Sequence, residues 1–147
     1  MIIVSNHQSL VENFLPLWVL DHLRPRYVAK RSMGSWIPAV SYNLRRAGHC
    51  LIERNDRDGA LEAIRQLGER VARGEVSAMI FPEGPRSASG IMNPFKYAGL
   101  SALLNAAPQA PVLPVVFYGG NRVFPRGIPR VRAFSTVRMK ILEPLSR

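Results

Sequence analysis

The amino-acid sequence predicts an α/β fold in a single domain, on three observations. Residues 76–81 and 111–118 are continuous apolar runs, which are typical of strands covered on both faces in a parallel sheet. Residues 55–73 form the clearest helix, because apolar residues recur along them at helical spacing. The chain has 147 residues, 47% of them hydrophobic, which is enough for one domain with its own core.

The first part of the chain predicts alternating strands and helices. Residues 1–4 are apolar and predict a short strand, and residues 10–23 predict a largely buried helix. A helix that starts at Ser9 would hold Pro16 in its interior, whereas a start at Asn13 leaves this proline in the tolerated first turn. Further strands are expected over 26–30 and 50–52, and a helix over 36–46.

The remaining elements follow from capping and periodicity. Asp56 favours the start of the helix over 55–73, and Gly74 favours its end. Pro114 predicts either an edge position or a bulge for the strand over 111–118. A helix is expected through residue 104 after residues 93–96, a basic loop over 122–130, and a half-solvated strand with a basic outer face over 131–141.

The charge of the chain indicates a polyanionic partner. Twenty Lys and Arg against ten Asp and Glu give a net charge of +10 at pH 7, which suits nucleic acid, an anionic membrane surface or phosphorylated substrates. The arginines are dispersed along the chain, which favours a basic face over a basic tail. The single cysteine, Cys50, excludes an internal disulfide and a cysteine-rich metal site. No apolar run approaches the ~20 residues of a membrane span.

A histidine and a carboxylate stand close together in residues 5–12. His7 follows the first predicted strand, and Glu12 comes five residues later. An imidazole, with an unperturbed pKa of about 6.5, is suited to take a proton from a hydroxyl, and a carboxylate can orient it. The two side chains meet only if His7 lies in a loop and Glu12 in or just before the first helical turn. Alternatively, Ser9 and Glu12 form a capping box that turns Glu12 away from His7.

Charged residues also follow two other predicted strands. Glu83, Gly84, Pro85 and Arg86 form a turn after residues 76–81, and such a turn at the end of a buried strand is a typical place for a site. A plain turn is the alternative interpretation. Arg54 ends the strand over 50–52 beside a glutamate, where the charged pair is either a solvated end or the rim of a ligand crevice.

Taken together, four blocks of the sequence resemble the glycerolipid acyltransferases, especially the 1-acyl-sn-glycerol-3-phosphate acyltransferases. Residues 6–12 resemble the His-x4-Asp block of this family, and residues 48–54 resemble its apolar strand that ends in an acid and an arginine. Residues 81–87, Phe-Pro-Glu-Gly-Pro-Arg-Ser, resemble the block Phe-Pro-Glu-Gly-Thr-Arg-Ser, and residues 112–116 resemble an apolar strand with proline. The likeness covers most of the chain. Glu12 replaces the usual Asp, however, and Pro85 replaces the usual Thr.

The resemblance implies one acyltransferase domain over residues 1–147, with a mixed, mostly parallel sheet flanked by helices. An N-terminal segment, which carries hydrophobic helices in this family, is expected to be missing. The implied reaction moves a fatty acyl group from a thioester, acyl-CoA or acyl carrier protein, to a hydroxyl of lysophosphatidic acid or a related lysophospholipid. No metal and no cofactor besides this co-substrate is implied. The chain is then expected to act as a peripheral protein on an anionic membrane surface, at the cytoplasmic face, with no nucleic-acid partner.

The resemblance also implies roles for the site residues. His7 is expected to be the general base, and Glu12 to orient its imidazole, as in a Ser-His-Asp triad whose hydroxyl comes from the substrate. Arg54 and Arg86 are expected to bind the acceptor phosphate, since guanidinium forks suit phosphate oxygens. The other expected substrate-binding residues are Gln8, Ser9, Glu83, Gly84 and Pro85.

Other hypotheses stay open at this point. The changes at Glu12 and Pro85 motivate a catalytically impaired protein of the same fold that binds anionic lipid. A nucleic-acid-binding domain fits the net charge but lacks a helix-turn-helix, an aromatic RNA-binding motif and zinc spacing. A serine hydrolase that uses Ser9 is disfavoured, because the sequence holds no Gly-x-Ser-x-Gly elbow.

Overall fold

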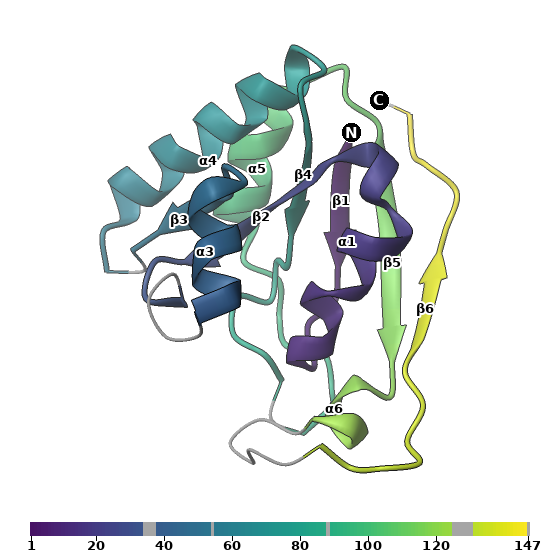
Figure 1. The fold of residues 1–147 in the computed structure, drawn as a ribbon. Helices are drawn as coiled ribbons and strands as arrows, with labels where there is room; N and C mark the ends of the chain where they lie inside the picture. Colours follow the sequence, from purple (N-terminus) through teal and green to yellow (C-terminus); the bar gives the residue numbers. More distant parts are fainter. Residues whose placement is uncertain (34–37, 54, 88, 125–130, 147) are drawn as a thin grey trace.

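A six-stranded sheet forms the centre of the computed structural model, which describes residues 1–33, 38–53, 55–87, 89–124 and 131–146. The strand order is β3-β2-β4-β1-β5-β6, and all neighbours pair in parallel except β5 and β6 (Figure 1). The predicted mixed, mostly parallel sheet is therefore confirmed. The strands are β1 (Ile2–Ser5), β2 (Pro25–Lys30), β3 (Cys50–Ile52), β4 (Ser77–Ile80), β5 (Val112–Tyr118) and β6 (Arg138–Ile141).

Two layers of helix cover the sheet, one on each face. The helices α4 (Arg57–Ala72) and α5 (Tyr97–Ala106) enclose one core, and the segment that holds α1 (Leu15–Val19) encloses the other. Ile2 packs in the α4 and α5 core and Ile3 in the opposite one, and both are fully buried. A strand buried on both faces needs apolar residues at every position, which explains the continuous apolar runs.

The long helix α4 begins and ends as predicted. Asp56 is its N-cap, and the Asp56 carboxylate accepts a hydrogen bond from the Gly59 N–H at 3.0 Å. Gly74 follows its end with a φ of 72°, the left-handed conformation that favours glycine. Gly68 lets α4 approach α5, because a Cβ at this position would lie 2.6 Å from the Cβ of Ala106.

The single buried helix predicted over residues 10–23 is wrong. Three short pieces replace it, namely the 3₁₀ turns η1 (Leu10–Asn13) and η2 (Asp21–Leu23) with α1 between them. The first break has two causes: Tyr27 Oη donates to the Asn13 carbonyl at 2.8 Å, and Pro16 lies in the first turn of α1. The segment is also less buried than predicted, since Trp18 is 82% exposed.

The C-terminal part of the sheet differs from the prediction in two ways. The strand with Pro114 is not at the edge, because β5 lies between β1 and β6. β5 itself carries no extra residue either: between the pairs Val112–Leu145 and Val115–Ile141, the facing chain has one residue more than β5, so the irregularity lies opposite Pro114 and not in its strand. The strand predicted over 131–141 is confirmed only for β6. Phe134 adopts a φ of 55°, which turns the chain before β6 begins.

The remaining helices are α3 (Pro38–Arg46) and α6 (Gly120–Val123). The predicted start of the helix at residue 36 lies outside the described residues. Within the described part of the chain, no helix is long and apolar enough to cross a membrane.

Candidate active site

The loop after β1 brings His7 and Glu12 into contact. His7 Nδ1 lies 3.0 Å from Glu12 Oε2, and the Glu12 side chain is fully buried. An ionised carboxylate only accepts hydrogen bonds, so a charged Glu12 would place the proton of this contact on Nδ1 of His7. The other ring nitrogen, Nε2, is then the one left to act on a substrate.

The backbone geometry explains how residues five apart can meet. His7 lies in the loop before η1, and Glu12 lies within η1, as the contact requires. Ser9 caps this turn, since its Oγ accepts from the Val11 N–H at 3.4 Å. Glu12 does turn back towards the start of the turn, where its Oε2 also accepts from the Gln8 N–H at 2.7 Å. The capping-box alternative is therefore wrong: Ser9 Oγ accepts from the Val11 N–H, and the Glu12 carboxylate accepts from the Gln8 N–H and contacts His7.

A second buried carboxylate fixes the backbone of the same loop. Glu83 follows β4 and is 1% exposed. Its Oε1 accepts from the His7 N–H and its Oε2 from the Asn93 N–H, both at 2.7 Å. The Ser87 N–H donates to the His7 carbonyl at 2.9 Å. The turn after β4 thus holds both polar backbone groups of His7, and Phe81 stacks on the His7 ring with centroids 4.2 Å apart.

His7 lines a cavity of about 750 Å³ at the carboxyl ends of the parallel strands, which is the usual position of a ligand site in an α/β sheet. Its walls are largely apolar and come from the sheet, α3 and α4. They include Val28, Ile52, Leu61, Ile64 and Ile80. Four cationic side chains of the described residues also line it, namely Lys30, Arg57, Arg86 and Lys96. The cavity therefore combines a base, an apolar interior and positive charge.

Three of these cations were not predicted as site residues. Lys30 ends β2, Arg57 begins α4, and Lys96 immediately precedes α5. Lys30 was within reach of sequence reasoning, because the carboxyl ends of parallel strands meet at one edge of a sheet. Lys96 lies over Gly84: its Nζ would be 3.5 Å from a Cβ at that glycine, whose φ is 78°.

The predicted substrate-binding residues divide into two groups. Gly84, Pro85 and Arg86 line the cavity with His7. Gln8 and Ser9 do not: Gln8 Nε2 donates to the Gly90 carbonyl at 3.0 Å, and Ser9 Oγ donates to the Phe124 carbonyl at 3.2 Å. Gln8, Ser9 and Glu83 thus hold the loops in place, and their contact with substrate stays a prediction. Arg54 lies outside the described residues.

His49 and Cys50 form a separate, structural group. His49 Nδ1 accepts from the Tyr27 N–H at 2.9 Å. Burial, followed by the positive charges of Arg26 and Arg70, lowers the pKa of His49 to about 4. Burial raises the pKa of the Cys50 thiol to about 11. Among the described residues, no three His, Cys, Asp or Glu side chains form a group that would hold a metal ion.

Comparisons with known proteins agree on one family. A family model described as Acyltransferase matches residues 1–118. The 1-acyl-sn-glycerol-3-phosphate acyltransferase of Cocos nucifera is 29% identical over 144 residues, which cover 98% of this chain and 45% of the relative. The beta form of this enzyme from Homo sapiens is 31% identical over 144 residues, which cover 98% of this chain and 50% of the relative.

A solved structure extends the similarity to the fold. The crystal structure of the 1-acyl-sn-glycerophosphate acyltransferase PlsC from Thermotoga maritima superposes with a TM-score of 0.71 at 27% identity. The match covers 99% of this chain and 55% of that protein. The chain thus spans about half the length of the relatives it matches.

Proposed function

The chain belongs to the acyltransferase family, and from that membership we propose that it transfers a fatty acyl group to a hydroxyl of lysophosphatidic acid or a related lysophospholipid. The observation that carries the proposal is the contact between buried Glu12 and His7, which lines an apolar cavity with cationic side chains. An acyl chain and a phosphate group are the two parts of a substrate that such a cavity suits.

In the proposed reaction, His7 Nε2 takes the proton from the acceptor hydroxyl. The hydroxyl oxygen attacks the thioester carbonyl, the new C–O bond forms, and the C–S bond breaks. The departing thiolate then takes the proton back from the imidazolium. Glu12 holds the ring through Nδ1 at 3.0 Å and stabilises its protonated form. Such general-base assistance contributes typically ~10²–10⁴ in rate. The donor is a thioester, either acyl-CoA or acyl carrier protein.

The contact between His7 and Glu12 also bears on the impaired-enzyme alternative. Glutamate in place of the family's aspartate still reaches His7, and it also accepts from the Gln8 N–H. The geometry of the pair therefore favours a working base over a protein that has lost its chemistry.

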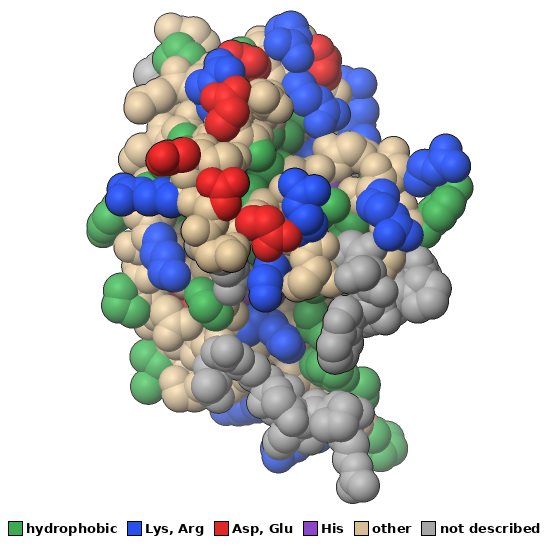
Figure 2. Space-filling model, turned by 90° about the vertical axis from the view of Figure 1, so that its left-hand side faces the viewer, with side chains coloured by type: hydrophobic (Ala, Val, Ile, Leu, Met, Phe, Trp, Pro, Cys, Tyr) green, Lys and Arg blue, Asp and Glu red, His purple; other side chains and the backbone are tan. Residues whose placement is uncertain are grey.

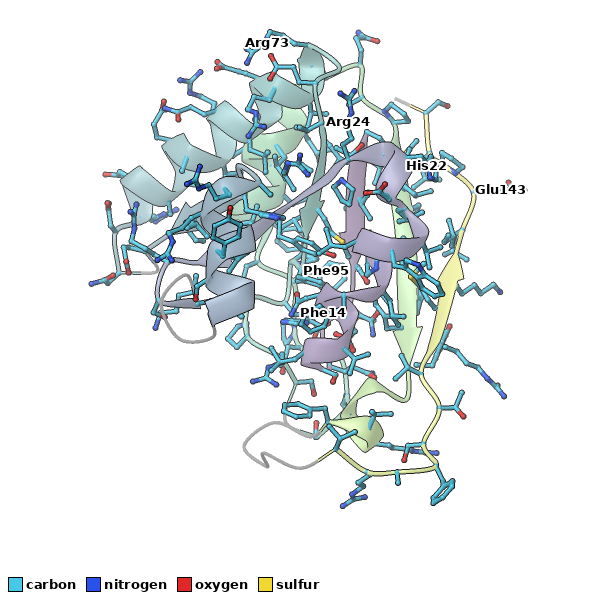
Figure 3. The ribbon with its side chains drawn as sticks, in the orientation of Figure 1. Phe14, His22, Arg24, Arg73, Phe95 and Glu143 are labelled. Atoms are coloured by element: carbon cyan, nitrogen blue, oxygen red, sulfur yellow. The ribbon has the colours of Figure 1, made fainter. Side chains whose placement is uncertain are left out.

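The first test is turnover of lysophosphatidic acid and an acyl thioester by the His7→Ala variant. We expect kcat to fall by about 10²–10⁴, with an unchanged melting temperature. His22→Ala is the matched control, because His22 is exposed. It also lies well away from Phe14, which directly follows the η1 turn that holds Glu12 (Figure 3). This control is expected to keep full activity. Turnover that survives the loss of His7 would exclude the proposed mechanism.

The second test concerns the phosphate of the acceptor. Arg86 and Lys96 line the cavity that His7 also lines, and a guanidinium or ammonium group there would bind an acceptor phosphate. We expect Arg86→Gln and Lys96→Met to raise KM for lysophosphatidic acid by about tenfold or more, with little effect on a monoacylglycerol that lacks phosphate. An equal effect on both acceptors would contradict this role.

We also propose that the chain works on an anionic membrane surface as a peripheral protein. The net charge of +10 supports this, since each basic residue near such a surface contributes about 1 kcal/mol. Exposed Phe14 and Trp18 beside the site loop supply apolar side chains of the kind that insert between lipids.

A further inference from the structure

The second oxygen of Glu12 lies in a space that a glycine leaves open. Oε2 takes both hydrogen bonds of this carboxylate, and Oε1 is buried without a hydrogen-bond partner. A Cβ built on Gly120 would lie 2.4 Å from Oε1. Cβ atoms essentially never approach another heavy atom so closely, so the carboxylate can occupy its present position only because residue 120 has no side chain.

The backbone that carries Gly120 is anchored on the same loop. Gly120 begins α6, which follows β5 and packs on η1 at the lower end of the sheet in Figure 1. The Phe124 N–H donates to the Gly120 carbonyl at 3.0 Å, and the Phe124 carbonyl accepts from Ser9 Oγ at 3.2 Å. A Cβ at residue 120 would also lie 3.0 Å from the Cβ of Ser9. The α6 turn therefore cannot withdraw from Glu12 without breaking its contact with Ser9.

We propose that Gly120 is a positioning residue for the base, and that it is matched to the glutamate at position 12. Because residue 120 has no side chain, Oε1 of Glu12 can occupy the space beside it. The carboxylate is then oriented so that Oε2 faces His7 Nδ1. The longer glutamate needs this space, whereas an aspartate, shorter by one methylene, would withdraw its carboxylate from it. The inference rests on the proposed function, because it assigns Gly120 an effect on the His7 base.

The test compares the Gly120→Ala change in two backgrounds, wild type and Glu12→Asp. With Glu12 present, the added methyl group displaces the carboxylate, and a 1 Å misplacement in a site costs about 10² in rate. We therefore expect kcat to fall by about that factor, with KM for the acceptor little changed. In the Glu12→Asp background, the same change is expected to cost less than about fivefold, the remainder arising from the contact with Ser9.

Two further readouts separate positioning from folding. Melting temperatures are measured for all four proteins, and Gly120→Ala should lower the melting temperature more in wild type than in the Glu12→Asp background. The difference in melting temperature can be measured even for a variant whose turnover is too slow to detect, so it tests the Gly120–Glu12 contact in that case too. The ¹⁵N signals of the His7 ring should shift in Gly120→Ala and return towards wild type when Glu12→Asp is combined with it.

Gly68→Ala is the matched control. A Cβ there would lie 2.6 Å from the Cβ of Ala106 in the α4–α5 interface, an overlap similar in size but distant from Glu12. It should lower the melting temperature equally in both backgrounds and leave the His7 ring signals unchanged. If Gly120→Ala behaves as this control does, or costs the same kcat in both backgrounds, the proposal is overturned. Activity that survives His7→Ala would refute only the role of His7 as the base. The Gly120–Glu12 contact is tested separately by the melting temperatures.

Discussion

At the scale of single residues, the carboxylate of Glu12 has two separable properties, its shape and its charge. One oxygen accepts from His7 and from the Gln8 N–H, and the whole side chain is removed from solvent. In a low-dielectric environment, a negative charge 3.0 Å from Nδ1 stabilises an imidazolium far more than a neutral acceptor does. The charge should therefore matter more for the rate than the hydrogen bond alone.

The Glu12→Gln variant tests this distinction. Its amide oxygen can still accept from the same two N–H groups, but it provides no charge for the imidazolium that forms during proton transfer. We expect kcat to fall by about 10² or more, with KM for the acceptor unchanged. Steady-state kinetics on lysophosphatidic acid would measure both parameters. A decrease smaller than about threefold would show that orientation, and not charge, is what Glu12 contributes.

His49 predicts a pH dependence of stability that is independent of the site. Its pKa is about 4 in the fold, whereas an unfolded histidine titrates near 6.5. The unfolded state therefore binds more protons between these values, and this contribution to stability is fully present above about pH 6.5 and is lost as the pH falls towards 4. The shift corresponds to on the order of 3 kcal/mol.

The measurement is urea unfolding at pH 7 and at about pH 4.5, for wild type and His49→Asn. Asparagine keeps an acceptor for the Tyr27 N–H but does not titrate. We expect the free energy of unfolding to fall with pH much more steeply in wild type than in the variant. Equal slopes would mean that His49 is not the group responsible.

At the scale of elements, Glu83 joins the ends of two neighbouring strands. It follows β4, and it accepts from the backbone of His7 after β1 and from Asn93 before α5. Two backbone N–H groups donate to Glu83, one to each oxygen, so the side chain at this position must accept a hydrogen bond at both terminal atoms. A carboxylate does so, whereas an amide presents one acceptor and one donor.

Glu83→Gln should therefore leave one buried N–H facing an N–H donor. We expect a loss of about 1–3 kcal/mol in the free energy of unfolding, together with a lower kcat because the His7 backbone is released. Urea unfolding and initial rates measure the two effects. Glu62→Gln, on the exposed face of α4, is the control and should change neither. Wild-type stability in Glu83→Gln would refute the role of Glu83 as a clamp.

At the scale of the whole molecule, charge is unevenly distributed between the two ends of the sheet. On the face shown in Figure 2, described acidic side chains are visible only in the upper half, where basic ones accompany them, while the charged side chains visible in the lower half are basic. The lower end is the one to which the parallel strands point, with η1 and α6 (Figure 1). Excess positive charge at this end of the sheet, where the cavity lies, would draw an anionic surface or substrate towards the cavity.

Binding to anionic vesicles should therefore depend strongly on salt. We expect the chain to float with phosphatidylglycerol vesicles at about 0.1 M salt and to dissociate at about 1 M, where the Debye length falls from ~10 Å to ~3 Å. Neutral phosphatidylcholine vesicles are the control and should bind weakly at both salt concentrations. Equal binding to both lipids would assign the interaction to apolar side chains such as Trp18 and not to charge.

Some of this molecule could be predicted from sequence because the causes are local. The ends of α4 depend on Asp56 and Gly74, which act within a few residues of the helix. His7 and Glu12 are also near neighbours in the chain, but spacing and capping left two orientations of Glu12 open, and the resemblance to the His-x4-Asp block is what favoured the contact. The helix predicted over residues 10–23 failed partly for the opposite reason, because Tyr27, from the next strand, holds the carbonyl of Asn13, while Pro16 is a local cause of the same break.

Periodicity along the chain was enough to predict the α/β class and the buried parallel strands, and the likeness of residues 6–12 to a family block indicated the pairing of His7 with Glu12. Two contacts, by contrast, depend on how distant segments pack: Glu83 clamps a backbone 76 residues away, and Gly120 makes room for Glu12. The packing of α5 on the sheet also placed Lys96 in the cavity that His7 lines. Local patterns could not predict these contacts, because they join side chains to distant parts of the chain, whose positions are set by how the strands and helices pack.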